Sequence, residues 1–266
     1  MITTWLISGD IHGNLERFIG LNVPKPETAI ILLGDCGFNY YGIHTGSKKV
    51  YPDKRDIKLK EDTQNLGYRF YCLRGNHEFR PELLPDIVLE YDEDVQGEVY
   101  YEPRYSNIRY FKNWGIYQIG EWKTAVIAGA YSVDKFYRIG RRYQWFDDEQ
   151  LSDSEQLECW RDLADQNVDL VLTHTCPYSW MPTDLFLPSI DQSTVDNKTE
   201  VFLEQLREVF DYNIWLFGHF HDDRYVRPGV EMLYEDIRDL DQLMKDWYSS
   251  SWTIPNGKRI DPNFFK

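Results

Sequence analysis

The sequence has few cysteines and none of the spacings that build disulfide frameworks or thiolate metal sites. Its 266 residues include four cysteines, Cys36, Cys72, Cys159 and Cys176. They are widely separated and form no Cys-x-x-Cys pair, which argues against a disulfide-stapled fold and against a zinc site built from thiolates. We therefore expect reduced thiols in a cytoplasmic protein.

The sequence also lacks a long apolar run, a signal-like start and an excess of positive charge. No hydrophobic stretch approaches the roughly 20 residues that span a bilayer. The first residues, MITTWLISGD, have neither a basic start nor a long apolar core. The formal net charge is −15, and an acidic surface repels a phosphate backbone. We therefore expect no membrane partner, and a nucleic-acid polymer is disfavoured as substrate.

Strand-like and helix-like segments alternate along most of the chain. Short apolar runs rich in branched residues predict strands, and longer amphipathic segments predict helices. The sequence SDSE at 152–155 is a capping box that marks a helix start. The predicted strands are 3–8, 28–34, 68–73, 115–119, 124–130, 168–174 and 213–219, and the predicted helices are 14–21, 58–66, 152–166 and 198–210. This alternation predicts the α/β class.

Two segments do not follow the alternation. Residues 81–113 begin with an acidic, aromatic stretch without clear periodicity, and we predict an insert or a surface flap there. Residues 235–266 form a C-terminal extension with a polar helix and a loose end. No repeat or linker divides the chain, so we predict one domain over residues 1–266.

Five of the six histidines lie at the carboxyl end of a predicted strand. They lie in or near the blocks GDIHG, GNHE and GHFH, and they are His12, His77, His174, His219 and His221. In open α/β sheets the carboxyl ends of the strands form the crevice where ligands bind. A shared position of this kind predicts one site rather than five unrelated core histidines.

Carboxylates and an amide accompany these histidines. Asp10 lies two residues before His12, and residues two apart on an extended segment point the same way, so the pair is expected to bind one ion. The same argument applies to His219 and His221. Carboxylate, imidazole and amide ligands together suit manganese, iron, zinc or nickel. There are too many ligands for one tetrahedral zinc, so we infer two metals.

A glycine directly precedes Asp10, Asp35, Asn76 and His219. Glycine removes side-chain bulk where the backbone turns sharply beside a site. We expect these four glycines to allow close packing around the ligands.

The ordered blocks D-x-H, G-D, G-N-H-E, H and G-H-x-H resemble the calcineurin-like metallophosphoesterase superfamily, in particular its small bacterial or phage-type members. The resemblance runs from Asp10 to His221 and implies a four-layer α/β/β/α sandwich of two mixed sheets flanked by helices. It also implies two metal sites that share Asp35. One would be formed by Asp10, His12, Asp35 and His221, and the other by Asp35, Asn76, His174 and His219.

The resemblance further implies a two-metal-dependent hydrolase of phosphate esters. A metal-bridging hydroxide would attack phosphorus in line, and His77 would assist the leaving group as proton donor or charge stabiliser. Two divalent ions are expected as cofactors, manganese first, with iron, zinc or nickel as alternatives. Glu78 is expected to hold its loop in shape.

The chain departs from the protein Ser/Thr phosphatases of this superfamily in its second block. Those enzymes continue as GDxxDRG, whereas this chain reads GDCGFN at 34–39. The aspartate that would orient His77 and the arginine that would grip phosphate are both missing. The stretch AYSVDKFYRIGRR at 130–142 is similar to one in some small bacterial and phage-type members. It offers Arg138 and Asp134 as substrate-binding residues, and the alternative is a basic surface turn.

Several alternatives stay open at this point. The substrate is a phosphodiester or a small phosphomonoester, such as a nucleotide-type molecule. The alternatives are a protein Ser/Thr phosphatase-like phosphomonoesterase and a non-catalytic scaffold with the same fold. The loop 176–192 either forms a wall of the cleft that sets specificity or serves packing alone. The oligomeric state is not predicted.

Overall fold

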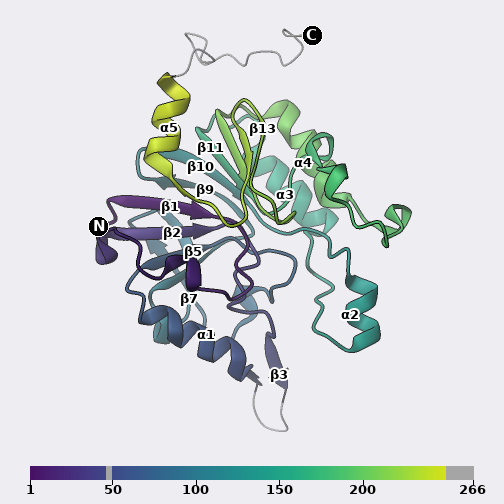
Figure 1. The fold of residues 1–266 in the computed structure, drawn as a ribbon, viewed down its shortest axis with the longest axis horizontal. Helices are drawn as coiled ribbons and strands as arrows, with labels where there is room; N and C mark the ends of the chain where they lie inside the picture. Colours follow the sequence, from purple (N-terminus) through teal and green to yellow (C-terminus); the bar gives the residue numbers. More distant parts are fainter. Residues whose placement is uncertain (46–49, 250–266) are drawn as a thin grey trace.

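A computed structural model describes residues 1–45 and 50–249. Two mixed sheets lie at its centre (Figure 1). The seven-stranded sheet has the order β15 (Ile237–Asp239), β1 (Thr4–Ser8), β2 (Thr28–Leu32), β5 (Arg69–Cys72), β8 (Ile108–Phe111), β7 (Gly97–Tyr101) and β6 (Val88–Asp92). The six-stranded sheet has the order β13 (Arg224–Arg227), β14 (Val230–Met232), β12 (Ile214–Phe217), β11 (Leu170–Thr173), β10 (Trp122–Ile127) and β9 (Trp114–Ile119). A separate hairpin joins β3 (Ile43–Thr45) to β4 (Val50–Pro52).

The middle strands of both sheets are parallel. Strands β1, β2, β5 and β8 run in one direction in the first sheet, and β10, β11, β12 and β14 do so in the second. Antiparallel strands complete the edges. Since the carboxyl ends of parallel strands meet at one edge of a sheet, the loops that follow them are brought together.

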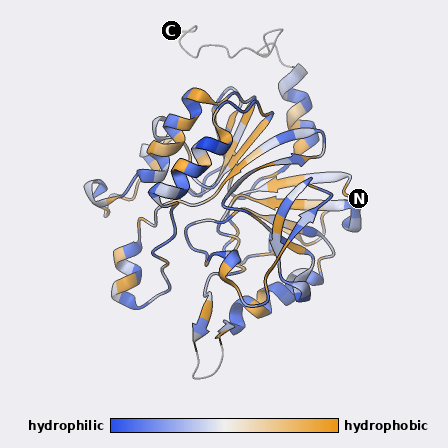
Figure 2. Cartoon of the chain, turned by 180° about the vertical axis from the view of Figure 1, so that it is seen from behind, coloured by the Kyte–Doolittle hydropathy of each residue, from blue (hydrophilic) through white to orange (hydrophobic). Residues whose placement is uncertain are grey.

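The main core lies between the two sheets. Ile7 and Ile31 of the first sheet pack in one buried cluster with Leu172 and Leu216 of the second. The strands are therefore apolar where the sheets face each other, whereas the helices carry polar residues outward (Figure 2). Burial of this apolar area is the main force that holds the two sheets together, at roughly 25 cal/mol per Å².

Helices cover the outer face of each sheet. The outer face of the second sheet packs against α3 (Asp153–Leu163) and α4 (Lys198–Val209). On the other side, Ile57 and Leu59 of α1 (Lys54–Gln64) pack against the outer cluster of the first sheet. The order is helix, sheet, sheet, helix, which confirms the predicted four-layer sandwich of two mixed sheets.

Two further helices lie outside these layers. The short helix α2 (Lys135–Arg141) projects to one side of the sandwich (Figure 1). Helix α5 (Leu240–Ser249) packs on β1 and β15, and its residues Leu243 and Met244 join the core between the sheets. Within residues 1–45 and 50–249, none of the helices combines the length and the apolar character that crossing a bilayer requires.

Three sequence predictions about local structure need correction. Residues 14–21 form a single 3-10 turn, Glu16–Phe18, rather than a helix, because Ile19 is extended and Gly20 adopts a φ of +78°. The segment 81–113 contributes β6, β7 and β8 to the first sheet, so it is not an irregular excursion. The extension after Glu235 adds β15 to the same sheet before α5 begins, and its predicted loose end falls on residues 250–266, outside the described residues.

Candidate metal and phosphate site

The predicted ligands lie on loops that follow five parallel strands. Strands β1, β2 and β5 of the first sheet lead into the loops of Asp10, Asp35 and Asn76. Strands β11 and β12 of the second sheet lead into those of His174 and His219. Each sheet therefore supplies part of one cluster, and the sixth histidine, His44, lies in the hairpin strand β3 instead.

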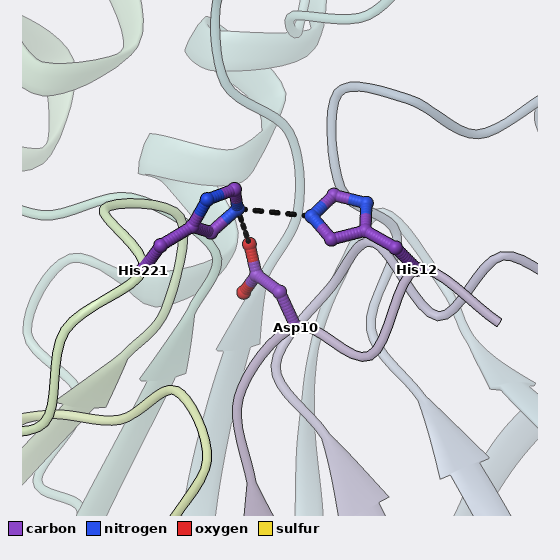
Figure 3. Close-up of side chains that lie close together, drawn as sticks. All are labelled: Asp10, His12 and His221. Carbon is purple, nitrogen blue, oxygen red and sulfur yellow. Dashed lines mark hydrogen bonds and ion pairs between the residues drawn. The ribbon is translucent and has the colours of Figure 1, made fainter. Parts of the chain in front are cut away.

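One group of ligand atoms is formed by Asp10, His12 and His221 (Figure 3). The Nε2 atoms of His12 and His221 face each other at 2.9 Å. Asp10 Oδ2 lies 3.3 Å from His221 Nε2 and is buried without a hydrogen-bond partner. Because an unpartnered buried carboxylate oxygen is costly, this group has the character of a cation site.

A second group lies deeper and includes Asp35, Asn76 and His174. Asn76 Oδ1 is 2.8 Å from His174 Nε2, and Asp35 Oδ1 is 3.7 Å from the same nitrogen. The other nitrogen of His174, Nδ1, donates to the carbonyl oxygen of Leu33 at 2.7 Å. That bond fixes the ring orientation and leaves Nε2 as the atom available to a metal. The His219 ring lies beside His174, with ring centroids 4.9 Å apart.

Backbone amides anchor one oxygen of each carboxylate. The amide of His219 donates to Asp10 Oδ1 at 2.9 Å, and the amide of His77 donates to Asp35 Oδ1 at 2.9 Å. The first bond links the two sheets, since Asp10 follows β1 of one sheet and His219 follows β12 of the other. In both residues one oxygen is oriented by the protein and the other points into the cluster.

Three of the four glycines have the expected role, whereas a Cβ on Gly9 would lie 2.0 Å from the carbonyl oxygen of Leu233 and not against a ligand. A Cβ on Gly75 would lie 2.1 Å from Asp35 Oδ1, and one on Gly218 would lie 2.3 Å from Asp10 Oδ1. A Cβ on Gly34 would lie 2.1 Å from His174 Nδ1. These contacts are far closer than any carbon atom tolerates, so the ligand side chains occupy the space where a glycine side chain is missing.

The geometric reason given for the D-x-H and H-x-H pairs is wrong, although the side chains do converge. His12 has a φ of +44°, His219 of +72° and His221 of +55°, so these segments bend rather than run extended. Asp35 is also left-handed, with a φ of +44°. A left-handed backbone conformation is strained for residues other than glycine, and residues that adopt it occur often at functional sites. The convergence therefore comes from tight turns.

Burial and mutual charge together set the ionisation of the cluster. Burial alone would raise the pKa of Asp35, but His77, His174 and His12 lower it below its ordinary value. The pKa of Asp10 is likewise lowered, because His174 and His221 outweigh the effect of burial. Burial and the neighbouring His174 lower the pKa of His219 to about 3. Two ionised carboxylates beside a neutral imidazole are the protonation states that metal binding requires.

His77 meets Arg138 rather than an aspartate. Arg138 Nη2 lies 3.2 Å from His77 Nε2, so this ring nitrogen accepts a hydrogen bond. Arg138 also donates from Nε to Asp134 Oδ2 at 2.7 Å and from Nη1 to the Tyr40 hydroxyl at 2.6 Å. Burial lowers the pKa of His77, and the charge of Arg138 lowers it further against the opposing effect of Asp35. Arg138 therefore reaches the site, whereas Arg141 and Arg142 of the same stretch are exposed.

Sequence reasoning missed two residues that orient this site. The Tyr40 hydroxyl holds Arg138, and the Ser132 hydroxyl accepts from Asn76 Nδ2 at 2.8 Å. The bond to Ser132 turns the amide oxygen of Asn76 toward His174. Ser132 lies in the same AYSVDKFYR stretch as Arg138, so the motif carried a signal for it. For Tyr40 the sequence contained no signal other than its position shortly after the GD block.

Glu78 holds the loop, as predicted. Its carboxylate accepts from the amide of Gly75 at 3.1 Å and from that of Gly37 at 3.0 Å. Burial, with a contribution from Asp35, raises the pKa of Glu78 to about 8. The loop 176–192 packs at least in part, because Trp180 is buried against Trp215.

The donor set fits two divalent cations. Ligand-to-metal distances of about 2.0–2.2 Å place neighbouring ligand atoms about 3 Å apart. The facing pairs His12 Nε2 with His221 Nε2, at 2.9 Å, and Asn76 Oδ1 with His174 Nε2, at 2.8 Å, have this separation. Asp10, Asp35 and His174 also bring ligand atoms within 4.8 Å of one another, so the two groups are adjacent.

Comparison with known proteins identifies a family for this chain. A family model described as calcineurin-like phosphoesterase matches residues 4–223. That range contains each of the five loops and most of both sheets. No curated protein shows significant sequence similarity to the chain.

Proposed function

The chain belongs to the calcineurin-like phosphoesterase family, and we propose that it hydrolyses a phosphodiester or a small phosphomonoester with two divalent metal ions. The family and the Asp and His groups support a metal-dependent phosphoesterase. Two pairs of facing ligand atoms give the proposal its main support. They are His12 Nε2 with His221 Nε2 at 2.9 Å in the first group and Asn76 Oδ1 with His174 Nε2 at 2.8 Å in the second.

We assign Asp10, His12, Asp35 and His221 to one ion and Asp35, Asn76, His174 and His219 to the other. Manganese is the proposed metal, since carboxylate, amide and imidazole donors suit it. Two bound ions would supply a nucleophile from water at neutral pH and neutralise charge on the phosphoryl oxygens. Asp35 belongs to the second group, and its Oδ2 lies 4.0 Å from His12 Nδ1 of the first group, so we propose it as the shared ligand.

Arg138 and His77 are the proposed contacts to the substrate. The guanidinium of Arg138 is suited to bind phosphoryl oxygens in pairs, and Asp134 and Tyr40 hold it in place. When the phosphate takes the hydrogen bond that Arg138 Nη2 gives to His77 Nε2, that ring nitrogen keeps Asn76 Nδ2 as a neighbour at 3.3 Å and can hold a proton at the leaving oxygen. Arg138 thereby replaces the phosphate-binding arginine that the GDCGFN block lacks.

The acidic charge of −15 favours a small substrate over a nucleic-acid polymer. The cytoplasmic location expected from the cysteine pattern also stays a prediction. A protein Ser/Thr phosphatase-like activity and a non-catalytic scaffold are the alternatives.

The experiment is hydrolysis of p-nitrophenyl phosphate and bis-p-nitrophenyl phosphate with manganese, with zinc and with chelator. Turnover of either ester that chelator abolishes is the expected result, and the preferred ester separates phosphatase from phosphodiesterase. Stoichiometric metal without turnover of any phosphate ester would favour the scaffold.

A further inference from the structure

A cavity beside the candidate site extends beyond the residues that the proposed metal chemistry uses. Its volume is about 410 Å³, within the roughly 300–1,000 Å³ of small-molecule sites. His12 and Arg138 line it, so it is continuous with the site. The rest of its wall includes Tyr40, Tyr41, Arg55, Asp56 and Leu59. A substrate bound through its phosphate would extend its remaining part into this space.

Flat groups form one wall of the cavity. The guanidinium carbon of Arg55 lies 3.2 Å from the centroid of the Tyr41 ring, and the Tyr40 and Tyr41 rings meet edge to face at 4.8 Å. The side chain of Arg55 is 61% exposed, which leaves its outer face open to a ligand. A guanidinium plane stacks well on aromatic rings.

The charges of the cavity are already balanced by carboxylates. Arg55 donates from Nε and Nη2 to the two oxygens of Asp53, each at 2.9 Å, and Arg138 is paired with Asp134. Buried Asp56 adds another carboxylate, which accepts from backbone amides at 2.9 and 3.0 Å. With no surplus positive charge, the cavity favours an uncharged flat group over a second phosphate.

We propose that this cavity binds a planar aromatic group of the substrate, such as an aryl ring or a nucleobase, stacked against Arg55 and flanked by the tyrosines. This inference rests on the proposed function, since the phosphate of the same molecule occupies the adjoining site. It narrows the substrate class to aromatic or nucleoside phosphate esters.

The first test compares a phenyl ester with a methyl ester of the class that the wild-type chain hydrolyses. Leu59→Trp places a large ring in the cavity without changing its charge. The ratio of kcat/KM for phenyl over methyl ester should fall about fivefold or more, the lower end for stacking of one base. Inhibition by inorganic phosphate, which fills the phosphate site alone, should be unchanged.

The second test distinguishes binding of an aromatic group in the cavity from binding of an anionic group. Arg55→Lys retains the charge and loses the flat face, whereas Arg55→Ala loses both. Stacking predicts that the two variants lose the phenyl preference to a similar degree. If Arg55→Lys behaves like the wild type while Arg55→Ala does not, the cavity binds an anionic group and the proposal is overturned.

If the folded Leu59→Trp variant keeps the wild-type ratio of kcat/KM for phenyl over methyl ester, the cavity proposal is also overturned. The proposed function would still hold in that case, because the wild type hydrolyses the ester. Absence of turnover on both esters by the metal-loaded wild type would contradict the proposed function and the aromatic site together.

Discussion

At the scale of single residues, three of the candidate ligands, His174, Asn76 and Asp10, have one atom held by the protein and one atom turned toward a neighbour. His174 uses Nδ1 on Leu33 and presents Nε2. Asn76 uses its amide nitrogen on Ser132 and presents its oxygen. Asp10 uses Oδ1 on the His219 amide and leaves Oδ2 without a hydrogen bond. The side chains are therefore oriented before any cation arrives, which lowers the cost of binding one.

Replacing His77 tests the separation between metal binding and chemistry. Only its backbone amide touches a ligand carboxylate closely, at 2.9 Å from Asp35, so His77→Ala should retain the metal. Turnover should fall by roughly 10²–10⁴-fold, the usual range for a lost proton donor. Metal content is measured by elemental analysis and turnover with p-nitrophenyl esters.

His44→Ala is the matched control, because His44 pairs with Asp53 in the β3–β4 region outside the cluster. Its turnover should stay near that of the wild type. Loss of bound metal in His77→Ala would mean that His77 is itself a ligand.

The sequence predicts the ligand types well and their orienting partners poorly. The histidines and carboxylates occur in short blocks after apolar strands, and such blocks are visible without a structure. The bond from Arg138 to Tyr40 joins residues 98 positions apart, and that from Asn76 to Ser132 joins residues 56 apart. A local motif can point to a residue such as Ser132, but which side chain it contacts at these separations depends on how the loops fold.

At the scale of elements, the site is built by the short turns that follow the strands. Glycines in these turns lie directly against ligand side chains, and four non-glycine residues there adopt left-handed backbone, His12, Asp35, His219 and His221. The turns are thus tight enough to bring side chains from neighbouring strands onto one point.

A methyl group at the turn after β12 should disturb the carboxylate that packs there. In Gly218→Ala the new Cβ would lie 2.3 Å from Asp10 Oδ1, so Asp10 must move. We expect metal affinity to fall by about 10–100-fold, as for lost orienting contacts at other metal sites. Titration of the metal-free chain with manganese, followed by calorimetry, measures this.

Gly140→Ala provides the comparison, since a Cβ at this position of α2 meets nothing within 4 Å. It should bind manganese like the wild type. Equal affinity in the two variants would show that close packing at Gly218 does not matter for the site.

Element prediction succeeds for buried strands and fails for edge elements. Strands β2, β11 and β12 are fully buried and read as continuous apolar runs. Strand β6 lies at the edge of its sheet and is mostly exposed. Its sequence therefore lacks the apolar pattern from which a strand is predicted. The segment 14–21 has a helical composition, but the side chain of Asn14 accepts from the Glu16 amide and stabilises a turn instead.

At the scale of the whole molecule, the candidate site spans the junction between the two sheets. Asp10, Asp35 and Asn76 come from one sheet, and His174 and His219 come from the other. The bonds from His174 to Leu33 and from His219 to Asp10 cross this junction. Cation binding should therefore stabilise the packing of the sheets as well as the loops.

Buried acids make the stability of the molecule dependent on pH. Glu200 of α4 is buried, and its Oε1 accepts from the Thr175 hydroxyl at 2.8 Å while Oε2 has no partner. Burial raises the pKa of Glu200 from 4.5 to about 7. The folded chain therefore retains this proton longer than the unfolded chain, and Glu200 lowers stability as pH rises from about 4.5 to 7.

Glu200→Gln removes this titration with little change in shape. Between pH 5 and pH 8 the wild type should lose about 2–3 kcal/mol more unfolding free energy than the variant. Urea unfolding of the metal-free chain at both pH values measures the difference. Parallel pH profiles for the two proteins would show that Glu200 is ionised in the folded state throughout.

If two cations share Asp35, the metal content of the chain must show it. The chain is loaded with manganese, dialysed and analysed for metal per chain, as wild type and as Asp35→Asn. We predict close to two ions per wild-type chain and a loss at both sites in the variant, with activity lost in parallel. One ion per wild-type chain, or two ions and near-normal activity in Asp35→Asn, would contradict the shared two-metal site.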